Sequence, residues 1–217
     1  MKNNIGSKPA NELRGSSPLL ETATFSRRFP IMVCVKFFII TTILTGLVYP
    51  LFIALIGQLV FPGQSNGSMM TNNGRVIGSA LISQKFDQDK YFWPRPSSQD
   101  YNPLPSGGSN LSATSKQLQD IVEARKQKLL KADPAKKAED IPSDLIYASA
   151  SGLDPHISPA AAVFQVDRVV KDRGLDSAKK DAIIALIGRL TEGRDLGVFG
   201  EPRVNVLRLN AELDNIR

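Results

Sequence analysis

The sequence predicts an α+β protein, in which a single N-terminal transmembrane helix precedes one mixed α/β extracytoplasmic domain. Three observations lead to this fold class: an uncharged apolar run, basic residues in front of it, and alternating helix-like and strand-like patterns behind it. The 217 residues suffice for one domain and one additional element. The expected division is a disordered cytoplasmic tail (1–28), the transmembrane helix (29–61), a linker (62–74) and the soluble extracytoplasmic domain (75–217).

The apolar run is long enough to cross a membrane. No charged residue occurs between Phe37 and Gly74, and the stretch FFIITTILTGLVYPLFIALIGQLVF covers residues 37–61. At about 1.5 Å per residue, a helix of this length spans about 37 Å, which exceeds the hydrocarbon core of about 30 Å. A cleaved signal peptide has a shorter apolar region and ends at a site with small residues, and neither feature occurs here. The run therefore predicts an uncleaved anchor.

The basic residues before the helix predict its orientation. Arg27, Arg28 and Lys36 lie on the N-terminal side, and such flanks stay in the cytoplasm. The chain after the helix is then expected outside the cytoplasm. Within the helix, Pro50 is expected to cause a kink, and Gly46 to allow close packing against other membrane helices.

The region after the helix alternates between extended and helical patterns. The expected elements are a strand over 75–83, a helix over 114–131, a helix from Ser158-Pro159 to Gly174, a helix capped by Asp176 and a strand over 203–209. Serine followed by proline begins helices, and glycine often ends them. The loop over 93–110 is rich in Pro, Ser and Gly, and its aromatic residues favour an ordered binding loop.

Composition excludes several classes of site. The chain has one cysteine and one histidine, so neither an internal disulfide nor a His/Cys zinc site can form, and no metal is expected. The net charge is +6, but the basic excess lies mainly before residue 37. Because a nucleic-acid-binding protein carries its basic residues on a folded face, no nucleic-acid partner is expected.

The only histidine, His156, lies in the segment SASGLDPHISPAAA. Asp154 is expected to close an Asx turn, Pro155 to restrict the backbone, and Ser158 to cap the next helix. His156 is then part of a rigid lead-in whose side chain binds nearby backbone. We assign these four residues, together with Asn205, a structural or interface role.

A catalytic alternative uses the same histidine. The segment GQSNG (63–67) matches the G-x-S-x-G pattern of hydrolases, and Ser65, Asp154 and His156 follow in the chain order of a catalytic triad. In this alternative, the chain is a stand-alone membrane-anchored extracytoplasmic hydrolase or solute-binding protein. The pattern requires a strand before the serine and a helix after it, which the sequence does not predict.

Six motifs together resemble one protein family. In order from Thr45 to Asp214, they are TGLVYPL, GSALISQKF, YFWPRPSS, YNPLPSGGSNLS, ASGLDPHISPAAAVFQVDRV and VNVLRLNAELD. They are similar to the C subunit of the Kdp potassium-transporting ATPase, a P-type pump. The resemblance implies a non-catalytic accessory subunit in the bacterial plasma (inner) membrane. Its implied partners are a potassium-conducting multi-span subunit, an ATP-hydrolysing P-type subunit and a very small membrane subunit.

The resemblance also implies a link to nucleotide. The family is described as a catalytic chaperone that raises the ATP affinity of the hydrolysing subunit. The implied contacts are Ser106, Gly107, Gly108, Ser109 and Asn110, which are similar to the nucleotide-contacting signature of ABC transporters. The flanking charges, however, place this segment outside the cell, away from cytoplasmic ATP. We therefore expect no firmly bound cofactor, and ATP only through the complex.

Overall fold

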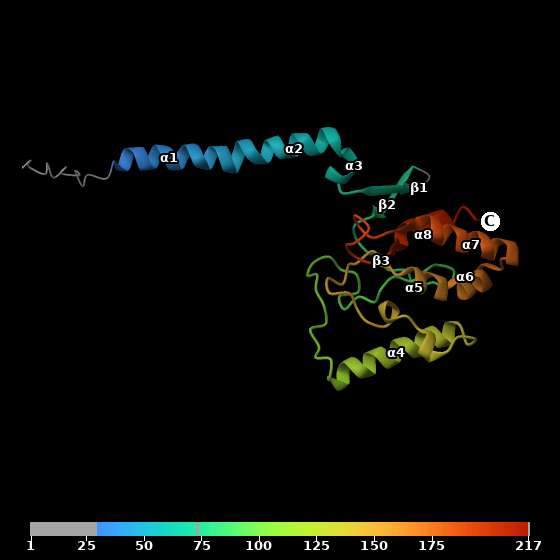
Figure 1. Ribbon diagram of the computed structural model, residues 1–217. Coiled ribbons are helices and arrows are strands. Elements are labelled where there is room, and N and C mark those ends of the chain that lie inside the picture. Colours follow the sequence, from blue (N-terminus) through green and yellow to red (C-terminus); the bar gives the residue numbers. More distant parts are fainter. Residues whose placement is uncertain (1–29, 73, 217) are drawn as a thin grey trace, which may run out of the picture. The chain divides into compact units, whose positions relative to one another are not determined.

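A computed structural model of the chain describes residues 30–72 and 74–216. It contains both helices and strands (Figure 1), which confirms the predicted fold class. The chain divides into two compact units, residues 1–53 and 54–217. The predicted disordered tail (1–28) lies outside the described residues.

One helix, Ile31–Val60, is long and apolar enough to cross a membrane. It consists of α1 (Ile31–Ile43), a π-helical turn η1 (Leu44–Val48) and α2 (Tyr49–Val60). Pro50 has no N–H to donate, and its ring excludes the carbonyl four residues earlier. The π-helical turn ends at Val48, two residues before Pro50, and the kink expected at Pro50 stays a prediction. Gly46 lies within this turn, and a Cβ atom added there would meet no atom within 4 Å.

Residues 62–74 differ from the expected linker, because they contain regular structure. A short helix, α3 (Pro62–Ser65), is followed by β1 (Met69–Asn72), which pairs antiparallel with β2 (Arg75–Ser79). The Asn73-Gly74 dipeptide is a strong hairpin signal and could have predicted this pair of strands. Gly74 has a φ of +75°, which suits glycine in a tight turn. The strand expected over 75–83 accordingly ends at Ser79.

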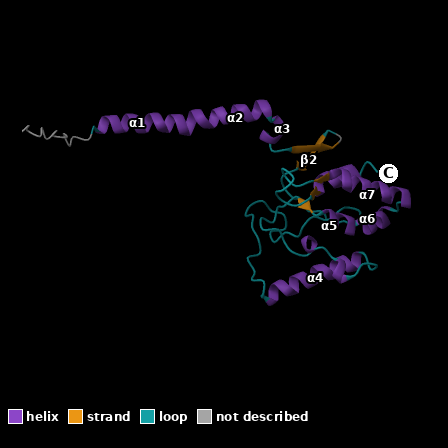
Figure 2. Ribbon diagram, viewed as in Figure 1, coloured by secondary structure: helices purple, strands orange, loops and turns teal. Residues whose placement is uncertain are grey.

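In the described part of the α/β region (69–72 and 74–216), one α-helix and two short 3₁₀ helices precede a three-stranded antiparallel sheet, and four α-helices lie between or after its strands in the chain. The elements are α4 (Lys116–Ala132), the short 3₁₀ helices η2 (Ala138–Asp140) and η3 (Ser143–Leu145), β3 (His156–Ile157), α5 (Pro159–Phe164), α6 (Val166–Arg173), α7 (Ser177–Leu190), β4 (Thr191–Glu192), β5 (Arg203–Asn205) and α8 (Val206–Leu213). The strand order is β3-β5-β4. Figure 1 shows α5 to α8 grouped together, with α4 on the other side of the loops. Figure 2 shows that long loops connect β2 to α4 and α4 to β3.

The helix ends follow the sequence signals closely. Ser158 Oγ accepts a hydrogen bond from Ala161 N at 3.0 Å, and Asp176 Oδ1 accepts one from Lys179 N at 2.9 Å, so both predicted N-caps are present. α6 ends at Gly174, which has a φ of +62°. The helix expected from 158 to 174 is, however, divided into α5 and α6 at Gln165.

The strand expected over 203–209 is wrong beyond Asn205. From Val206 onward the chain is helical, and Asn205 Oδ1 caps α8 by accepting a hydrogen bond from Arg208 N at 3.1 Å. The buried residues of α8 follow helical spacing: Val206, Leu207, Leu209, Asn210 and Leu213. The valines at the start of this segment favour a strand, but the Asn205 cap and the helical spacing of the buried residues stabilise a helix.

Candidate functional site

The segment Tyr91–Pro94 has no regular structure, yet Phe92 and Trp93 are buried. Asn210 binds both backbone groups of Phe92: Phe92 N donates to Asn210 Oδ1 at 2.9 Å, and Asn210 Nδ2 donates to Phe92 O at 3.0 Å. Gln165 binds Trp93 in the same way, at 2.8 and 3.2 Å. Two side-chain amides thus satisfy the buried backbone of this extended segment. We call these two residues and Arg168 the polar clamp.

Arg168, the third residue of the polar clamp, is only 4% exposed. Its Nη2 donates to Gln165 Oε1 at 2.6 Å, and its Nη1 donates to the carbonyl oxygens of Tyr91, at 3.0 Å, and of Asp89. Its guanidinium carbon lies 4.0 Å from the centre of the Trp93 ring, a cation–π arrangement. Burial lowers the pKa of Arg168 to about 10, so the side chain stays charged at neutral pH. The polar clamp was not predicted from the sequence, although Gln165 and Arg168 share a helical face with the apolar Val169.

The loop that follows the clamped segment is attached to residues 149–152. Gly107 N donates to Ser151 O at 2.9 Å, and Ser98 Oγ donates to Gly107 O at 2.7 Å. The hydroxyl of Tyr101 donates to Arg95 O at 3.0 Å, and burial raises the pKa of Tyr101 to about 12. The loop expected to be ordered is therefore held by backbone and side-chain hydrogen bonds.

Two glycines allow the loop to approach this segment closely. A Cβ atom on Gly108 would lie 3.1 Å from Ala150 O, and one on Gly152 would lie 3.0 Å from Gly107 O. Gly152 also has a φ of +70°. Close backbone packing therefore accounts for glycine at 108 and 152 without any ligand.

Gly152→Ala is expected to lower the free energy of unfolding by about 1–3 kcal/mol, because the added Cβ meets backbone and the φ is positive. Urea unfolding of the full chain in detergent, followed by the fluorescence of the single, buried Trp93, measures this loss. Gly107→Ala is the matched control, since its Cβ would meet nothing within 4 Å. Equal losses in both variants would contradict the packing explanation.

A cavity of about 660 Å³ opens beside the loop. Its lining includes Gly108, Ser109 and Asn110 but not Ser106 or Gly107, so the structure brings together three of the five residues implied as nucleotide contacts. The other lining residues are mostly hydroxyl, amide and apolar side chains: Ser97, Ser98, Gln99, Leu111, Gln117, Leu118, Ile121, Arg125, Tyr147, Ala148, Ser149 and Ala150.

Arg125 is the only charged residue in that lining. Its Nη1 donates to Ile146 O at 2.8 Å, and burial lowers its pKa. The lining contains no carboxylate and no histidine. The cavity can therefore offer hydrogen bonds to a polar molecule, but it lacks a pair of groups for general acid–base chemistry.

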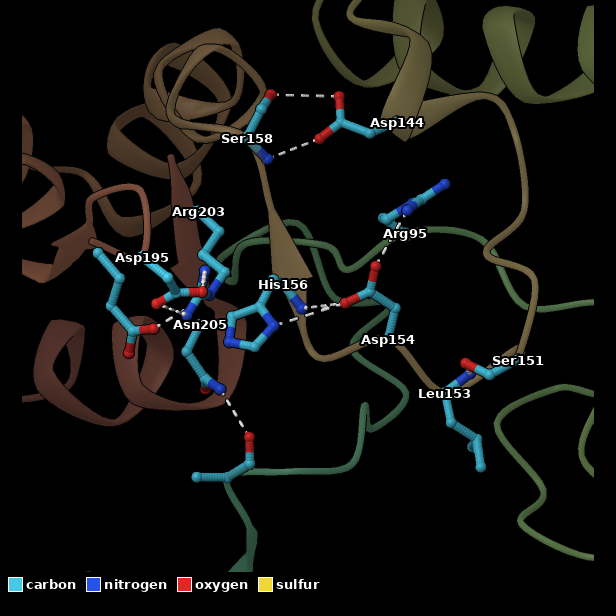
Figure 3. Close-up of polar contacts among 12 residues, drawn as sticks. Arg95, Asp144, Ser151, Leu153, Asp154, His156, Ser158, Asp195, Arg203 and Asn205 are labelled. Atoms are coloured by element: carbon cyan, nitrogen blue, oxygen red, sulfur yellow. Dashed lines mark hydrogen bonds and ion pairs between the residues drawn. The ribbon is translucent and has the colours of Figure 1, made fainter. Parts of the chain in front are cut away.

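His156 lies next to Asp154 in the expected Asx turn (Figure 3). His156 N donates to Asp154 Oδ1 at 3.0 Å, and His156 Nδ1 lies 3.5 Å from the same oxygen. The described partner of the ring is thus a carboxylate and not the backbone that we expected. Arg95 Nη1 lies 3.0 Å from Asp154 Oδ2. Burial alone would raise the pKa of Asp154, but hydrogen bonds from His156 and Arg95 outweigh it and hold the pKa below its usual value.

Asp154→Asn is expected to flatten the pH dependence of stability below about pH 5. Because the folded-state pKa of Asp154 lies below its ordinary value of 3.8, the carboxylate stabilises the fold above that value. This contribution is lost as the pH falls through the folded-state pKa. Asparagine keeps an oxygen for His156 N but does not titrate. Urea unfolding of the native chain and the variant at pH 7 and pH 3 tests this. If the free energy of unfolding changed equally between the two pH values in both proteins, the prediction would be refuted.

The other residues assigned a structural role surround the same sheet. Ser158 N donates to Asp144 Oδ2 at 2.7 Å. Pro155 O accepts a hydrogen bond from Val206 N at 2.9 Å. Asn205, which pairs with His156 across β3 and β5, donates from Nδ2 to Ala80 O at 2.7 Å. This arrangement joins the residue that follows β2, the loop before β3, and the start of α8. Gly46 and Pro50 belong to the apolar helix and not to this group.

The structure does not place Ser65 in a hydrolase site. Ser65 is the last residue of α3, which follows the apolar helix and not a strand. Its Oγ would lie 2.9 Å from a Cβ atom on Gly57. The described contacts of the His156 ring involve Asp154. The G-x-S-x-G pattern therefore lacks the strand–turn–helix context that exposes a nucleophile.

Comparison with known proteins supports the resemblance carried by the six motifs. A family model described as "K+-transporting ATPase, c chain" matches residues 31–215. A curated "Potassium-transporting ATPase KdpC subunit" from Burkholderia orbicola (strain MC0-3) is 50% identical over 183 residues, which cover 83% of this chain and 93% of the relative. Proteins of the same name from Dechloromonas aromatica (strain RCB) and Methylococcus capsulatus are 48% and 47% identical over 84% and 82% of this chain, and 95% and 94% of the relatives. The chain therefore belongs to the family of K+-transporting ATPase c chains, the KdpC subunits.

Proposed function

We propose that this chain stabilises the assembled potassium pump as a non-catalytic subunit. The observation that carries the proposal is the apolar helix Ile31–Val60, which is long enough to cross a membrane. One helix cannot enclose an ion path, and the sequence contains no D-K-T-G phosphorylation motif. The proposed partners are a potassium-conducting multi-span subunit, an ATP-hydrolysing P-type subunit and a very small membrane subunit.

The helix is proposed to provide one of the surfaces on which these partners pack. Gly46 leaves open space beside the backbone, and small residues allow membrane helices to approach closely. Thr45 Oγ1 donates to Thr41 O at 2.7 Å within the helix, so its hydroxyl needs no partner from lipid. Packing around Gly46 and the π-helical turn is therefore the proposed source of association.

The membrane placement is proposed to be single-pass in the plasma (inner) membrane, with the N-terminus in the cytoplasm and the α/β region outside. The flanking Arg27 and Arg28, which lie outside the described residues, and Lys36 support this orientation. In a Cys34→Ser background, a cysteine at Ser68 is expected to react with an impermeant reagent in intact cells. If instead a cysteine introduced at Lys8 reacted with the reagent, the N-terminus would lie outside the cell and the proposed orientation would be wrong.

Any effect on nucleotide is proposed to act through the complex. In the segment Ser106–Asn110, Gly107 N already donates to Ser151 O, and the next helix begins only at Lys116. Firm triphosphate binding normally uses several free N–H donors at a helix N-terminus and a lysine. We expect a dissociation constant for ATP of about 1 mM or weaker for the full chain alone. Calorimetry in detergent tests this: micromolar binding that is lost in Ser109→Ala would overturn it.

A pull-down in mild detergent through a tag at Arg217 tests the assembly role. The expected result is co-purification of a multi-span membrane protein and of a protein with a D-K-T-G motif. Replacing residues 31–61 with an unrelated transmembrane helix is expected to keep membrane insertion but to weaken this association. Recovery of the native chain alone would overturn the proposed function.

A further inference from the structure

The β1–β2 hairpin and the turn after it expose several apolar side chains. Thr71 lies directly opposite Val76 in the hairpin, and Met69 lies on the same face as Thr71 because side chains alternate along a strand. Met69 is 55% exposed and Val76 60%. Leu81 and Ile82, in the turn that follows β2, are also exposed. We call Met69, Val76, Leu81 and Ile82 the hairpin group.

Hydrogen bonds join the hairpin closely to the end of the apolar helix. Asn66 Nδ2 donates to Gln58 Oε1 at 3.2 Å and to Pro62 O at 2.7 Å, so the chain after α3 lies against the last turns of the helix. Ala80 N, just beyond β2, donates to Ser68 O at 3.0 Å. Both ends of the hairpin are therefore only a few residues away from the end of the helix.

The end of the apolar helix lies at the edge of the hydrocarbon core of the bilayer. About 20 helical residues cross this core. Counted from Lys36, the last charged residue before the uncharged run, they end near Gly57. A Cβ atom on Gly57 would lie 2.9 Å from Ser65 Oγ, so α3 contacts the helix at this boundary. The hairpin that follows α3 therefore begins where the lipid headgroups lie.

The charges of this segment fit a lipid surface. Between Glu21 and Asp87 the sequence has no acidic residue, and Arg75 is the only charged residue from 62 to 84. Arg75 is exposed, and no ion pair within residues 30–72 and 74–216 involves it. Lys85, the next charged residue, is paired with Asp100 at 2.8 Å. Apolar side chains beside an unpaired arginine are typical of segments that bind a bilayer surface, because the cation meets anionic headgroups.

We propose that the hairpin group lies in the headgroup region of the bilayer, with Arg75 next to anionic lipid headgroups. The proposal goes beyond the assembly role and requires only that the helix Ile31–Val60 crosses a membrane. A two-stranded hairpin is marginally stable in water, and β1 and β2 form a sheet separate from β3-β5-β4. Burial of its apolar side chains among lipids stabilises it. Because Asn205 donates to Ala80 O, the hairpin also limits how far β5 can move from the membrane surface.

Fluorescence quenching in vesicles tests where the hairpin lies. In a Cys34→Ser background, which removes the single cysteine, the full chain carries bimane at Val76→Cys and is reconstituted with phosphatidylcholine and phosphatidylglycerol. Lipids with bromine on the acyl chains close to the headgroup should quench this label at least about twofold more strongly than a label at Leu104→Cys. Leu104 is 82% exposed and lies outside the hairpin. Equal quenching at both positions would overturn the proposal.

A third label, at Leu47→Cys, separates the hairpin proposal from the membrane span on which it rests. Leu47 lies within the apolar helix, so lipids with bromine deeper in the acyl chains should quench a label there. If they do not, the helix does not cross the bilayer, and the span itself is wrong. If Leu47 is quenched but Val76 is not, only the hairpin proposal fails.

Cross-linking in the assembled pump distinguishes a lipid from a protein partner. A photo-crosslinking amino acid replaces Val76, and the complex is reconstituted in the same vesicles. The expected adduct joins this chain to phospholipid. An adduct with another subunit, or with a second copy of this chain, would show that protein covers the hairpin and that the proposal is wrong.

A charge reversal measures the contribution of Arg75. In the chain labelled at Val76, Arg75→Glu is expected to reduce quenching by the brominated lipids about twofold in vesicles that contain phosphatidylglycerol. The loss should be smaller in phosphatidylcholine alone. Lys116→Glu, a reversal at an exposed lysine at the start of α4, is the matched control and should leave quenching unchanged. Equal effects of the two reversals would refute a contact between Arg75 and anionic headgroups.

Discussion

Asn210→Ala is expected to lower the free energy of unfolding of the full chain by about 2–4 kcal/mol. The substitution removes both hydrogen bonds between the side chain and Phe92. It leaves a buried N–H and a buried C=O without partners, and each such loss costs about 1–3 kcal/mol. Urea unfolding in detergent, followed by Trp93 fluorescence, measures the change.

Asn215→Ala provides the control for this loss. Asn215 lies just beyond α8 and is exposed, and its described hydrogen bond comes from its backbone N to Glu212 O. Its replacement is expected to change the free energy of unfolding by less than about 0.5 kcal/mol. If Asn210→Ala had an equally small effect, the amide of Asn210 could not be what holds the Phe92 backbone.

Arg168→Leu is expected to destabilise the chain by about 3 kcal/mol, and to disturb the loop beyond Trp93. Leucine retains much of the buried volume but leaves the carbonyl oxygens of Asp89 and Tyr91 without their donor. It also removes one of the two cations that lie over the Trp93 ring, and leaves Lys128 at 4.4 Å from the ring centre. Trp93 directly precedes the loop that lines the cavity, so a disturbed loop changes the surroundings of Trp93. The fluorescence spectrum of Trp93 should therefore shift while the variant is still folded.

Two further variants separate the shape of the Arg168 side chain from its charge. Arg168→Lys retains the charge but not the planar group with several donors, so it should recover only part of the lost stability. Arg189→Leu removes an exposed arginine, paired with Glu212 at 2.5 Å, and should cost at most about 1 kcal/mol. Full recovery with lysine would show that charge alone, and not the hydrogen-bonding geometry, matters at position 168.

The membrane helix and the helix caps could be predicted from the sequence because their signals are local. The apolar helix was predicted from the length of the uncharged run 37–61, and the structure has a helix over Ile31–Val60. The caps at Ser158 and Asp176 form hydrogen bonds to residues three positions later. The Asx turn at Asp154 spans two residues. Short-range hydrogen bonds of this kind depend on residue type and spacing, which the sequence contains.

The cavity and its polar walls could be anticipated only in part. The segment 106–110 belongs to the loop that was expected to be ordered, but Gly108 is required by its approach to Ala150, 42 positions away along the chain. Arg125 gave no signal, because a charged residue in a helix is normally interpreted as part of a solvated face. Its position in the cavity lining depends on how the loop docks against α4.

The sequence by itself determined the membrane helix, the turn and caps around His156, and the family to which the chain belongs. Only the tertiary structure decided that Gln165, Arg168 and Asn210 are buried and that they hold the Phe92–Trp93 backbone. The Gln165–Trp93 and Asn210–Phe92 contacts join residues 72 and 118 positions apart. No local pattern encodes such pairs, because the burial that makes an amide–backbone hydrogen bond valuable arises only when distant segments pack together.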